Sequence, residues 1–443
     1  MMITVVLKFN GQINYDHLIS SLEVIVRRFR RFRQRIVRPD GFFRRPYWED
    51  DPHQQAEDHV DRVTLQIPAD DNALMELVSR KMSTALDSAH PLWRVTLVDN
   101  YPQGSALIIR VHHCIADGIS LMQVLLVMTQ VLFGEPGNHV PAGEANREKN
   151  QADPQLSFTQ PETRSFGQAQ AYKEISNTKP GKTTPRRNRD ILYGDSTLTE
   201  SVAAFARIIF RRPDPQTIFK GQLGQVKKAV WAEPFDLPEI RKIARYKQST
   251  PNDVLMAVAS AAIRRYLDLN RDKRKRNIRA FTMINLRRRF LDDELGNKFG
   301  LVFLTLPLDC EQPLECLEAL KQGMDDLKDS AECATTYHIL NILGWLPEWI
   351  EHLAVRFLDT KGTIVATNVA GPRHQISLAG APIQSIIAWV PQSGRIGVGL
   401  SFITYNNQVQ FAINTDVGVV PDPEKLLELF IEEYESFQTA LDS

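Results

Sequence analysis

The chain has 443 residues, a length that suits two or three domains with substantial buried cores. Hydrophobic residues make up 43% of the chain and charged residues 24%, and both fractions are ordinary for a globular protein. The 53 basic residues balance the 53 acidic ones, so no overall positive charge favours a nucleic-acid partner.

Neither the cysteines nor the N-terminus indicates export. Cys114, Cys310, Cys316 and Cys333 form no CxxC pair, which suits a reducing compartment and gives no zinc signature. Residues 1–15 lack a basic region followed by a long apolar core, so they are not a secretory signal. Apolar runs stay well short of the roughly 20 residues of a spanning helix, and we expect any membrane contact to be peripheral.

The first part of the chain predicts strands around one basic helix. Residues 2–9, "MITVVLKF", read as a strand that begins almost at the first residue, which suggests missing upstream sequence. A helix should follow, because apolar residues recur at intervals of three and four and form one stripe. The stripe comprises Leu18, Leu22, Ile25, Phe29 and Phe32. Residues 92–100 and 106–113 are apolar segments on either side of the turn "YPQGS", as in a hairpin.

A change of composition divides the chain. From Gly134 to about Thr199 the residues are mainly Pro, Gly, Asn, Gln and charged ones, which is typical of an exposed and partly disordered connection. We therefore expect an N-terminal domain over 1–135, a linker over 136–199 and a C-terminal domain over 200–443.

The C-terminal part mixes strands and helices. Residues 249–267 begin with turn residues and continue as a mostly apolar helix. The later elements are expected to be strands at 279–286, 301–308, 362–372 and 383–391, a helix at 313–331, a hairpin at 397–416 and a last helix at 422–441. Sequential hairpins without strict strand–helix alternation favour a mixed α/β (α+β) architecture of two domains.

The stretch "RVHHCIADG" carries the strongest chemical signal. If the preceding strand reaches His112, then His112 and His113 point to opposite faces of the sheet. Asp117 is well placed to cap a helix that starts near Ile119. A histidine at such a corner can accept a proton near neutral pH, while Asp117, alone or paired with Arg110, would hold the loop rigid. The alternative is that both histidines only satisfy backbone groups in a core.

Six short motifs between residues 91 and 372 resemble those of one protein family. "HHCIADG" resembles the HHxxxDG motif of CoA-dependent acyltransferases. The other blocks are similar to those of bacterial wax ester synthases/diacylglycerol acyltransferases: "PLW" at 91–93, "STPNDVL" at 249–255, "INLRRR" at 284–289, "LGNKFG" at 295–300 and "ATNVAGP" at 366–372. The last block departs from the family pattern, SNVPGP, at Thr367 and Ala370.

The resemblance implies a two-domain CoA-dependent acyltransferase-like fold, with a mixed sheet flanked by helices in each domain and the active site between them. It implies that His113 is the general base, that His112 supports the geometry and that Asp117 is mainly structural. The reaction would move a fatty acyl group from acyl-CoA to diacylglycerol or a long-chain alcohol, with no covalent enzyme intermediate, no metal and no cofactor besides this co-substrate. The family's setting is neutral-lipid storage, which implies a peripheral place on the inner membrane or on lipid inclusions in the cytoplasm.

The same blocks supply candidate substrate-binding residues. These are Gly118, Asn252, Asp253, Asn285 and Asn297. Asn252 and Asp253 also have a plainer interpretation, because Pro251 before them is typical of an ordinary helix start. Trp93 is expected in the core, as inward aromatic residues of a hairpin usually are.

Basic residues gather at 27–35, "RRFRRFRQR". A solvated helix face is the usual explanation of such a run, and the alternative is contact with anionic lipid or with the phosphates of CoA. The same alternative applies more weakly to Arg287, Arg288 and Arg289.

Other functions remain open at this point. Cys114 could form an acyl-enzyme, although a strand turns neighbouring side chains apart. A condensation-type acyltransferase acting on other acceptors shares the HHxxxDG motif. The chain could also be a weak, lipid-binding homologue, since it lacks the helix that usually precedes "MMITVV" in the family. A metal hydrolase using His112, His113 and Asp117 has no further ligand cluster, and a serine hydrolase has no GxSxG elbow.

Overall fold

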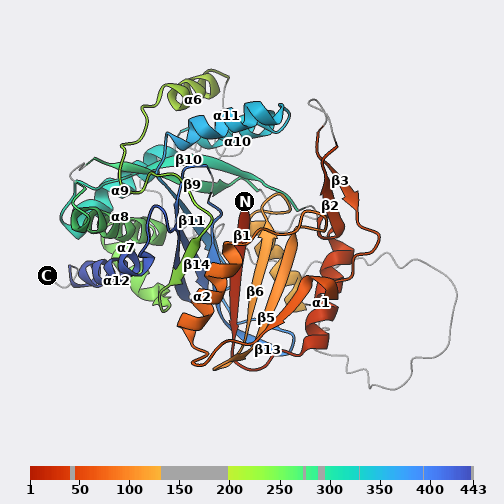
Figure 1. The fold of residues 1–443 in the computed structure, drawn as a ribbon. Helices are drawn as coiled ribbons and strands as arrows, with labels where there is room; N and C mark the ends of the chain where they lie inside the picture. The colour runs from red at the N-terminus through yellow and green to blue at the C-terminus, as the bar shows by residue number, and fades with distance from the viewer. Residues whose placement is uncertain are drawn as a thin grey trace, which may run out of the picture.

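A computed structural model describes residues 1–39, 45–130, 198–272, 276–287, 295–328, 330–392 and 394–440, apart from the side chains at 198, 200, 201 and 348. Most of the expected linker 136–199 lies outside the described residues, as do Arg288 and Arg289. The described chain is built around two large mixed sheets, each covered by helices on both faces (Figure 1). Within it, no helix combines the length and the apolar character needed to cross a membrane.

The first sheet has six strands, in the order β12-β13-β1-β6-β5-β4. Their bounds are β1 Met2–Phe9, β4 Val60–Val63, β5 Trp93–Tyr101, β6 Gly104–His112, β12 Ser377–Leu378 and β13 Ala381–Trp389. The expected hairpin is confirmed as β5–β6, and β4 pairs with β5 in parallel.

Alternation along β1 gives this sheet two buried faces. Leu7 packs with the apolar sides of α1 (Tyr15–Arg28) and α3 (Gly118–Gln130), whereas Val6 packs with α2 (Asp71–Met82). A strand buried on both faces is expected to be apolar almost throughout, as "MITVVLKF" is.

The basic helix ends earlier than its apolar stripe predicts. α1 stops at Arg28, and Phe29 has an extended backbone with φ −110° and ψ 101°. A short 3-10 turn, η1 (Arg30–Arg33), leads into β2 (Gln34–Val37), which pairs with β3 (Tyr47–Asp50). Phe29 and Phe32 are still buried, so the stripe was predicted correctly and the end of the helix was wrong. The pairing of β2 with β3 requires extended chain from Gln34 onward, so the helix has to end before that residue.

The second sheet has seven strands, in the order β10-β9-β11-β14-β15-β7, with β8 pairing against β15. Their bounds are β7 Lys227–Trp231, β8 Phe235–Asp236, β9 Ile278–Asn285, β10 Phe299–Leu306, β11 Ile364–Ala370, β14 Val398–Tyr405 and β15 Gln408–Asp416. β11 runs parallel to both of its neighbours, so this sheet is mixed as well.

Helices cover the second sheet on both faces. The larger core holds α7 (Leu237–Tyr246), α8 (Pro251–Leu269), α9 (Pro313–Lys328) and α12 (Pro423–Thr439). The opposite face carries α6 (Leu198–Phe210), α10 (Glu332–Leu343) and α11 (Glu348–Asp359), which pack on a smaller cluster around Phe281 and Phe303. Figure 1 shows these three helices side by side at the top of the molecule.

The chain does not keep its two halves in separate sheets. β12 and β13 belong to the C-terminal part of the sequence, yet β13 pairs antiparallel with β1, with Thr4 opposite Trp389 and Leu7 opposite Ile386. The region 200–443 therefore contributes strands to both sheets. The composition change near residue 135 could not indicate this, because strand exchange depends on which sheet edge is free to pair.

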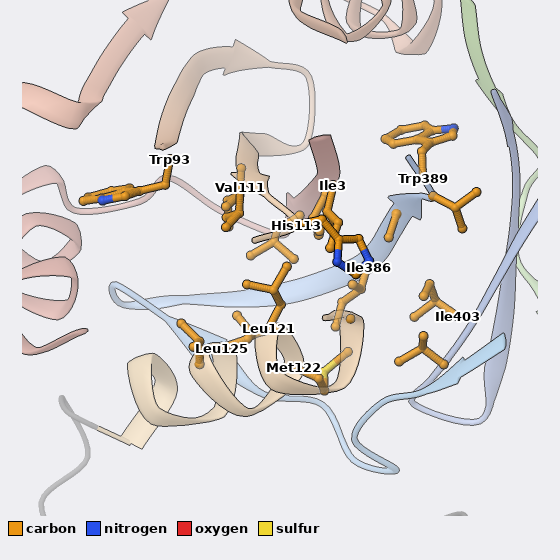
Figure 2. Close-up of a pocket in the computed structure, with 18 of the residues that line it drawn as sticks. Ile3, Trp93, Val111, His113, Leu121, Met122, Leu125, Ile386, Trp389 and Ile403 are labelled. Carbon is orange, nitrogen blue, oxygen red and sulfur yellow. The ribbon is translucent and has the colours of Figure 1, made fainter. Parts of the chain in front are cut away.

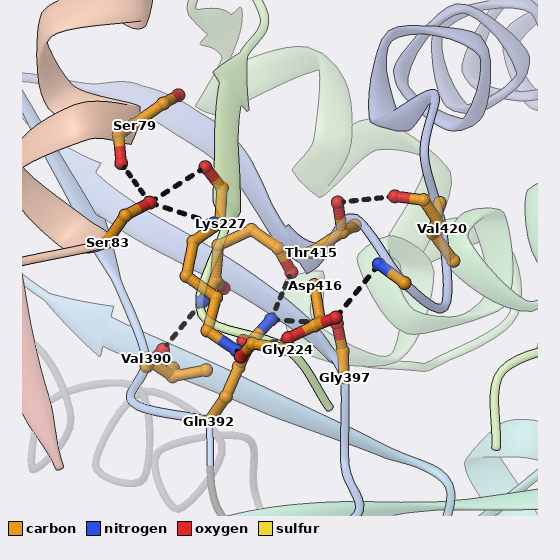
Figure 3. A network of polar contacts seen from close by, with 12 residues as sticks. Ser79, Ser83, Gly224, Lys227, Val390, Gln392, Gly397, Thr415, Asp416 and Val420 are labelled. Atoms are coloured by element: carbon orange, nitrogen blue, oxygen red, sulfur yellow. Dashed lines mark hydrogen bonds and ion pairs between the residues drawn. The ribbon is translucent and has the colours of Figure 1, made fainter. Parts of the chain in front are cut away.

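Helix α2 also ties the two halves together (Figure 3). The Ser79 hydroxyl accepts the Ala229 N–H of β7 at 3.0 Å, and the Ser83 hydroxyl accepts the Lys227 N–H at 2.9 Å. The Lys227 ammonium pairs with the buried carboxylate of Asp416 on β15. The two serine hydroxyls satisfy backbone N–H groups along an edge strand of the second sheet, so α2 protects that edge while holding the first sheet against it.

Candidate active site

An apolar cavity of about 120 Å³ lies where the two sheets meet (Figure 2). The first sheet and its helices supply most of the wall, including Ile3, Trp93 and Leu121. The second sheet supplies Met283 of β9, Thr367 and Val369 of β11, and Ser401 and Ile403 of β14. Trp93 is buried, as expected, and it is also part of the cavity wall.

His113 is the imidazole that lines this cavity. β6 ends at His112, so His113 is the first residue of the turn, and Figure 2 shows its ring among aliphatic side chains. Its ring meets the ring of Phe299 edge-on, with centroids 5.8 Å apart. Burial in this apolar setting lowers the pKa of His113 below its ordinary value. The neutral ring that results near pH 7 is the form that can accept a proton.

His112 turns away from His113, as the strand geometry predicted. Its Nδ1 lies 2.9 Å from Sγ of Cys114, and it is not part of the cavity wall. Burial lowers the pKa of His112 to about 4, so this ring is neutral as well. This contact lies within the turn that carries His113.

Asp117 caps α3. Its Oδ1 accepts the Ser120 N–H at 2.9 Å, and its backbone carbonyl accepts the Leu121 N–H at 2.9 Å. The helix begins at Gly118, one residue before the expected Ile119. The cap was therefore predicted correctly from the Asp-Gly corner.

The partner of Asp117 is Arg287, and the expected pairing with Arg110 is wrong. Asp117 Oδ2 accepts Arg287 Nη1 at 2.6 Å, and both side chains are buried, with 8% and 1% of their surface exposed. Arg110 donates to the Thr84 carbonyl instead. Arg110 lies on the face of β6 that α2 covers, whereas Asp117 leads into α3 on the other face.

Arg287 is thus an internal anchor, and its burial contradicts both alternatives weighed for it, a solvated surface position and contact with lipid or CoA. Its Nη2 donates to the Ser120 hydroxyl at 2.8 Å and to the Gly296 carbonyl at 2.6 Å. The Lys298 N–H donates to Asp117 Oδ2 at 3.0 Å. The blocks "INLRRR" and "LGNKFG", which lie at the end of β9 and the start of β10, therefore meet the HHxxxDG corner and clamp it from the second sheet.

Three of the expected substrate-binding residues lie near this clamp, and they differ in whether they face the cavity. Asn297 Nδ2 donates to the His113 carbonyl at 3.0 Å, so it holds the backbone of the histidine. Asn285 Oδ1 accepts the Arg287 N–H at 3.0 Å and closes a local turn. Gly118 is part of the cavity wall, where a Cβ would meet Val369 at 3.5 Å, an ordinary contact distance. Of these three residues, Gly118 is the one whose surface faces the cavity.

Asn252 and Asp253 begin α8. The Thr250 hydroxyl accepts the Asp253 N–H at 3.3 Å, and Asp253 Oδ2 accepts the Thr250 N–H at 2.8 Å, which is a complete capping box. Asn252 Oδ1 accepts Asn368 Nδ2 at 3.0 Å. Asn368 lies on β11 between two cavity residues, so Asn252 stands behind the wall of the cavity.

The roles of several site residues could not be read from the sequence. Arg287 is the main one, because an arginine after a strand looks like a surface residue until its partner 170 positions away is known. Thr367, Ser401 and Met283 reach the cavity only through the packing of the second sheet. A strand pattern indicates which side of the strand they occupy and does not indicate what lies opposite.

The competing chemistries find little support in this geometry. Burial raises the pKa of Cys114 to about 11, so its thiol is protonated near neutral pH, and its Sγ is not part of the cavity wall. Across the described residues there is no group of three or more His, Cys, Asp or Glu side chains arranged to hold a metal.

Much of the basic stretch 27–35 is already paired. Arg27 pairs with Glu23 at 2.9 Å, Arg30 with Asp50 at 3.2 Å and Arg35 with Glu49 at 2.7 Å. Each of these carboxylates offsets part of the positive charge that the sequence alone suggests.

Comparison with protein families agrees with the motifs. A model of the wax ester synthase/diacylglycerol acyltransferase catalytic domain matches residues 3–255, which is more than half of the chain. The chain belongs to the wax ester synthase/diacylglycerol acyltransferase family. A model of the C-terminal domain of the same family matches residues 295–438. The family assignment from the motifs is confirmed.

Similar proteins extend over nearly the whole chain. The probable diacylglycerol O-acyltransferase tgs1 of Mycobacterium tuberculosis H37Rv is 24% identical over 428 residues, which cover 93% of this chain and 85% of that protein. The O-acyltransferase WSD of Acinetobacter baylyi is 21% identical over 403 residues, which cover 88% of this chain and 83% of that protein.

The structure of the wax ester synthase/diacylglycerol acyltransferase from Marinobacter aquaeolei VT8 has the same fold. It aligns with a TM-score of 0.66 at 19% identity over 100% of this chain and 95% of that one. The expected two-domain acyltransferase-like fold is therefore confirmed.

Proposed function

We propose that this protein transfers a fatty acyl group from acyl-CoA to the hydroxyl of a diacylglycerol or a long-chain alcohol, giving triacylglycerol or wax ester. The observation that supports this best is His113, a neutral imidazole in the wall of an apolar cavity that both sheets line. The family membership of the chain gives the reaction class. The apolar wall suits the alkyl chains of both substrates.

In the proposed reaction, His113 takes the proton of the acceptor hydroxyl as the oxygen attacks the thioester carbonyl carbon. A tetrahedral oxyanion forms, and its collapse breaks the carbon–sulfur bond and releases CoA. The departing thiolate takes the proton back from the imidazolium, so the enzyme returns to its starting state. A thioester is already activated, so the step needs neither a nucleophile from the enzyme nor a metal or other cofactor.

The surroundings of His113 suit this role. A general base must be held within roughly 0.5 Å and 10–20° of its productive position, which requires supporting contacts around it. Asn297 holds the His113 carbonyl, while the Asp117–Arg287 pair fixes the start of α3 immediately after the turn. We assign these three as positioning residues.

The direct test is His113→Ala in the purified full chain, with palmitoyl-CoA and either hexadecanol or dioleoylglycerol as substrates. Loss of a general base should lower the rate of CoA release by roughly 10²- to 10⁴-fold. Cys114→Ser is the matched control, because it changes a neighbouring side chain that the proposed mechanism does not use, and it should keep its activity.

The results separate the remaining alternatives. If His113→Ala keeps activity within a factor of about ten, another group is the base. If Cys114→Ser instead abolishes transfer, the reaction proceeds through an acyl-cysteine. If the folded wild-type protein transfers no acyl group to either acceptor, the chain is a lipid-binding homologue or acts on another acceptor.

We also propose that the protein works at a lipid surface, either the cytoplasmic face of the inner membrane or a lipid inclusion. Diacylglycerol and long-chain alcohols are found in such phases rather than free in water, so the enzyme must reach them there. Co-sedimentation with vesicles tests this proposal, and failure of the wild-type protein to sediment with them would contradict it.

A further inference from the structure

The helices on the outer face of the second sheet carry apolar side chains that point to solvent. On α11, Trp349, Leu353 and Phe357 are 55%, 63% and 37% exposed, and they recur at intervals of four residues. Trp345, in the connection from α10, is 71% exposed. A surface helix normally buries its apolar stripe, so a helix that exposes one needs a further explanation.

Helix α6 repeats this arrangement. Its Ala204 and Ile208 are buried against the protein, while Val202, Phe205 and Ile209 form a second stripe that remains exposed. α10 contacts both α6 and α11, and Figure 1 shows the three helices together at one end of the molecule. We call the exposed apolar side chains of α6 and of the α10–α11 segment the α6–α11 patch.

Exposed arginines lie on and beside the helices of this patch. Arg207, Arg212 and Arg356 are exposed on or next to its helices, and the guanidinium of the exposed Arg45 lies 5.5 Å from the centre of the Trp345 ring. Among the described side chains of α6, α10 and α11, one carboxylate is exposed, that of Glu351. Tryptophans beside arginines are typical of the boundary between lipid headgroups and acyl chains.

The packing beneath the patch reaches the wall of the cavity. On their inner sides, α10 and α11 place Ile339 and Leu358 against the cluster around Phe281 and Phe303. Met283 and Val390 belong to this cluster, and both are also part of the cavity wall. Apolar packing therefore runs from beneath the patch to the site of His113.

We propose that the α6–α11 patch docks this protein on an anionic phospholipid surface and brings the acceptor lipid close to the cavity. The delivery of acceptor lipid rests on the proposed function, whereas the binding to the lipid surface can be measured without turnover. A symmetric contact between two copies is disfavoured, because it would bring the arginines of one patch against those of the other.

The test compares vesicle binding of two double variants of the full chain, without acyl-CoA. Trp349→Ser/Leu353→Ser removes the centre of the patch and leaves Trp345 with its Arg45 contact in place. The control, Tyr246→Ser/Leu269→Ser, removes side chains of similar exposure, 61% and 60%, from the helices on the other face of the sheet. With vesicles containing phosphatidylglycerol, the patch variant should bind at least about tenfold more weakly than the wild type, and the control should be unchanged.

A second pair of variants tests the charge. Arg207→Gln and Arg356→Gln should each weaken binding to phosphatidylglycerol vesicles by about fivefold and have little effect on phosphatidylcholine vesicles. Turnover of a short-chain alcohol without vesicles should be the same in the patch variant as in the wild type, while turnover of dioleoylglycerol in vesicles should fall.

Three results would overturn the proposal. One is equal vesicle binding by the patch variant and the wild type. The second is failure of the wild type to bind vesicles. The third is a wild-type dimer that the patch variant converts to a monomer without any vesicle binding, which would make the patch an interface between copies. If vesicle binding depends on the patch but no acyl transfer occurs, the docking surface stands and the proposed enzyme function fails.

Discussion

Two helices of this protein begin beside an aspartate from a recognised motif, and the two aspartates do different things. Asp117 at the start of α3 uses one oxygen to cap the helix and the other to bind Arg287, 170 residues away. Asp253 at the start of α8 closes a capping box with Thr250, three residues before it. Its second oxygen is buried and bonds to no group of the described chain.

The comparison separates a local role from a long-range role for the same residue type. A cap depends on residues within one turn of the helix, so both starts could be predicted from their sequences. The ion pair of Asp117 joins the two domains beside His113, and it depends on how the sheets pack. Breaking a buried pair leaves an uncompensated charge, so the two aspartates should differ greatly when they are replaced.

Asp117→Ala should show the largest effect on stability. It removes the cap and leaves Arg287 buried without its partner, which should lower the free energy of unfolding by about 3–5 kcal/mol. Urea unfolding measures this loss. Arg287→Met should have a similar effect, and the double variant should lose less than the sum of the two, because no charge is then left unpaired. A loss below about 1 kcal/mol for Asp117→Ala would show that the pair is not the clamp described here.

Asp253→Ala should have a smaller effect. It removes one bond of a capping box, which should cost about 1 kcal/mol in the same unfolding experiment. Thr250→Ala removes the reciprocal bond and should cost a similar amount. If Asp253→Ala instead cost more than about 3 kcal/mol, this aspartate would have a long-range role as well, and the contrast between the two corners would disappear.

The HHxxxDG corner should also respond to pH. Burial lowers the pKa of His113 and lowers that of His112 to about 4. Below the ordinary histidine value of about 6.5, the unfolded chain binds more protons than the folded one, so stability should fall as the pH drops from about 7 toward 4. Urea midpoints measured across this range should fall less steeply in His112→Gln than in the wild type.

The pH dependence of turnover provides a second measurement. Because the neutral ring of His113 is the active form, kcat/KM should decrease only when the pH falls below about 6.5, and should follow an apparent pKa lower than that value. An apparent pKa above about 6.5 for the group that must lose a proton would contradict the assignment of a buried neutral base at this corner.

Local sequence patterns predicted the backbone geometry of the HHxxxDG corner correctly. The apolar run of β6, the Asp-Gly pair and the apolar α3 placed His113 in a turn between a strand and a helix. Strand alternation predicted that His112 and His113 diverge. These features depend on backbone geometry over a few residues, which the side chains in that stretch largely determine.

Contacts between distant segments could not be read in the same way. The charges of Arg287 and of the arginines at 27–35 looked alike in the sequence, but Arg287 is buried on Asp117 while Arg27 lies exposed beside Glu23. The end of α1 depended on the pairing of β2 with β3, and the end of the first sheet depended on β13 crossing over to β1.

The sequence by itself determined the family, the order of most elements and the position of the proposed base in its turn, because each depends on motifs or on residues close together in the chain. Tertiary structure decided which charge stabilises Asp117, which side chains line the cavity and which apolar side chains stay exposed on α6 and α11. The physical reason is that burial and charge pairing depend on what packs opposite a residue, and packing brings together segments that the chain keeps far apart.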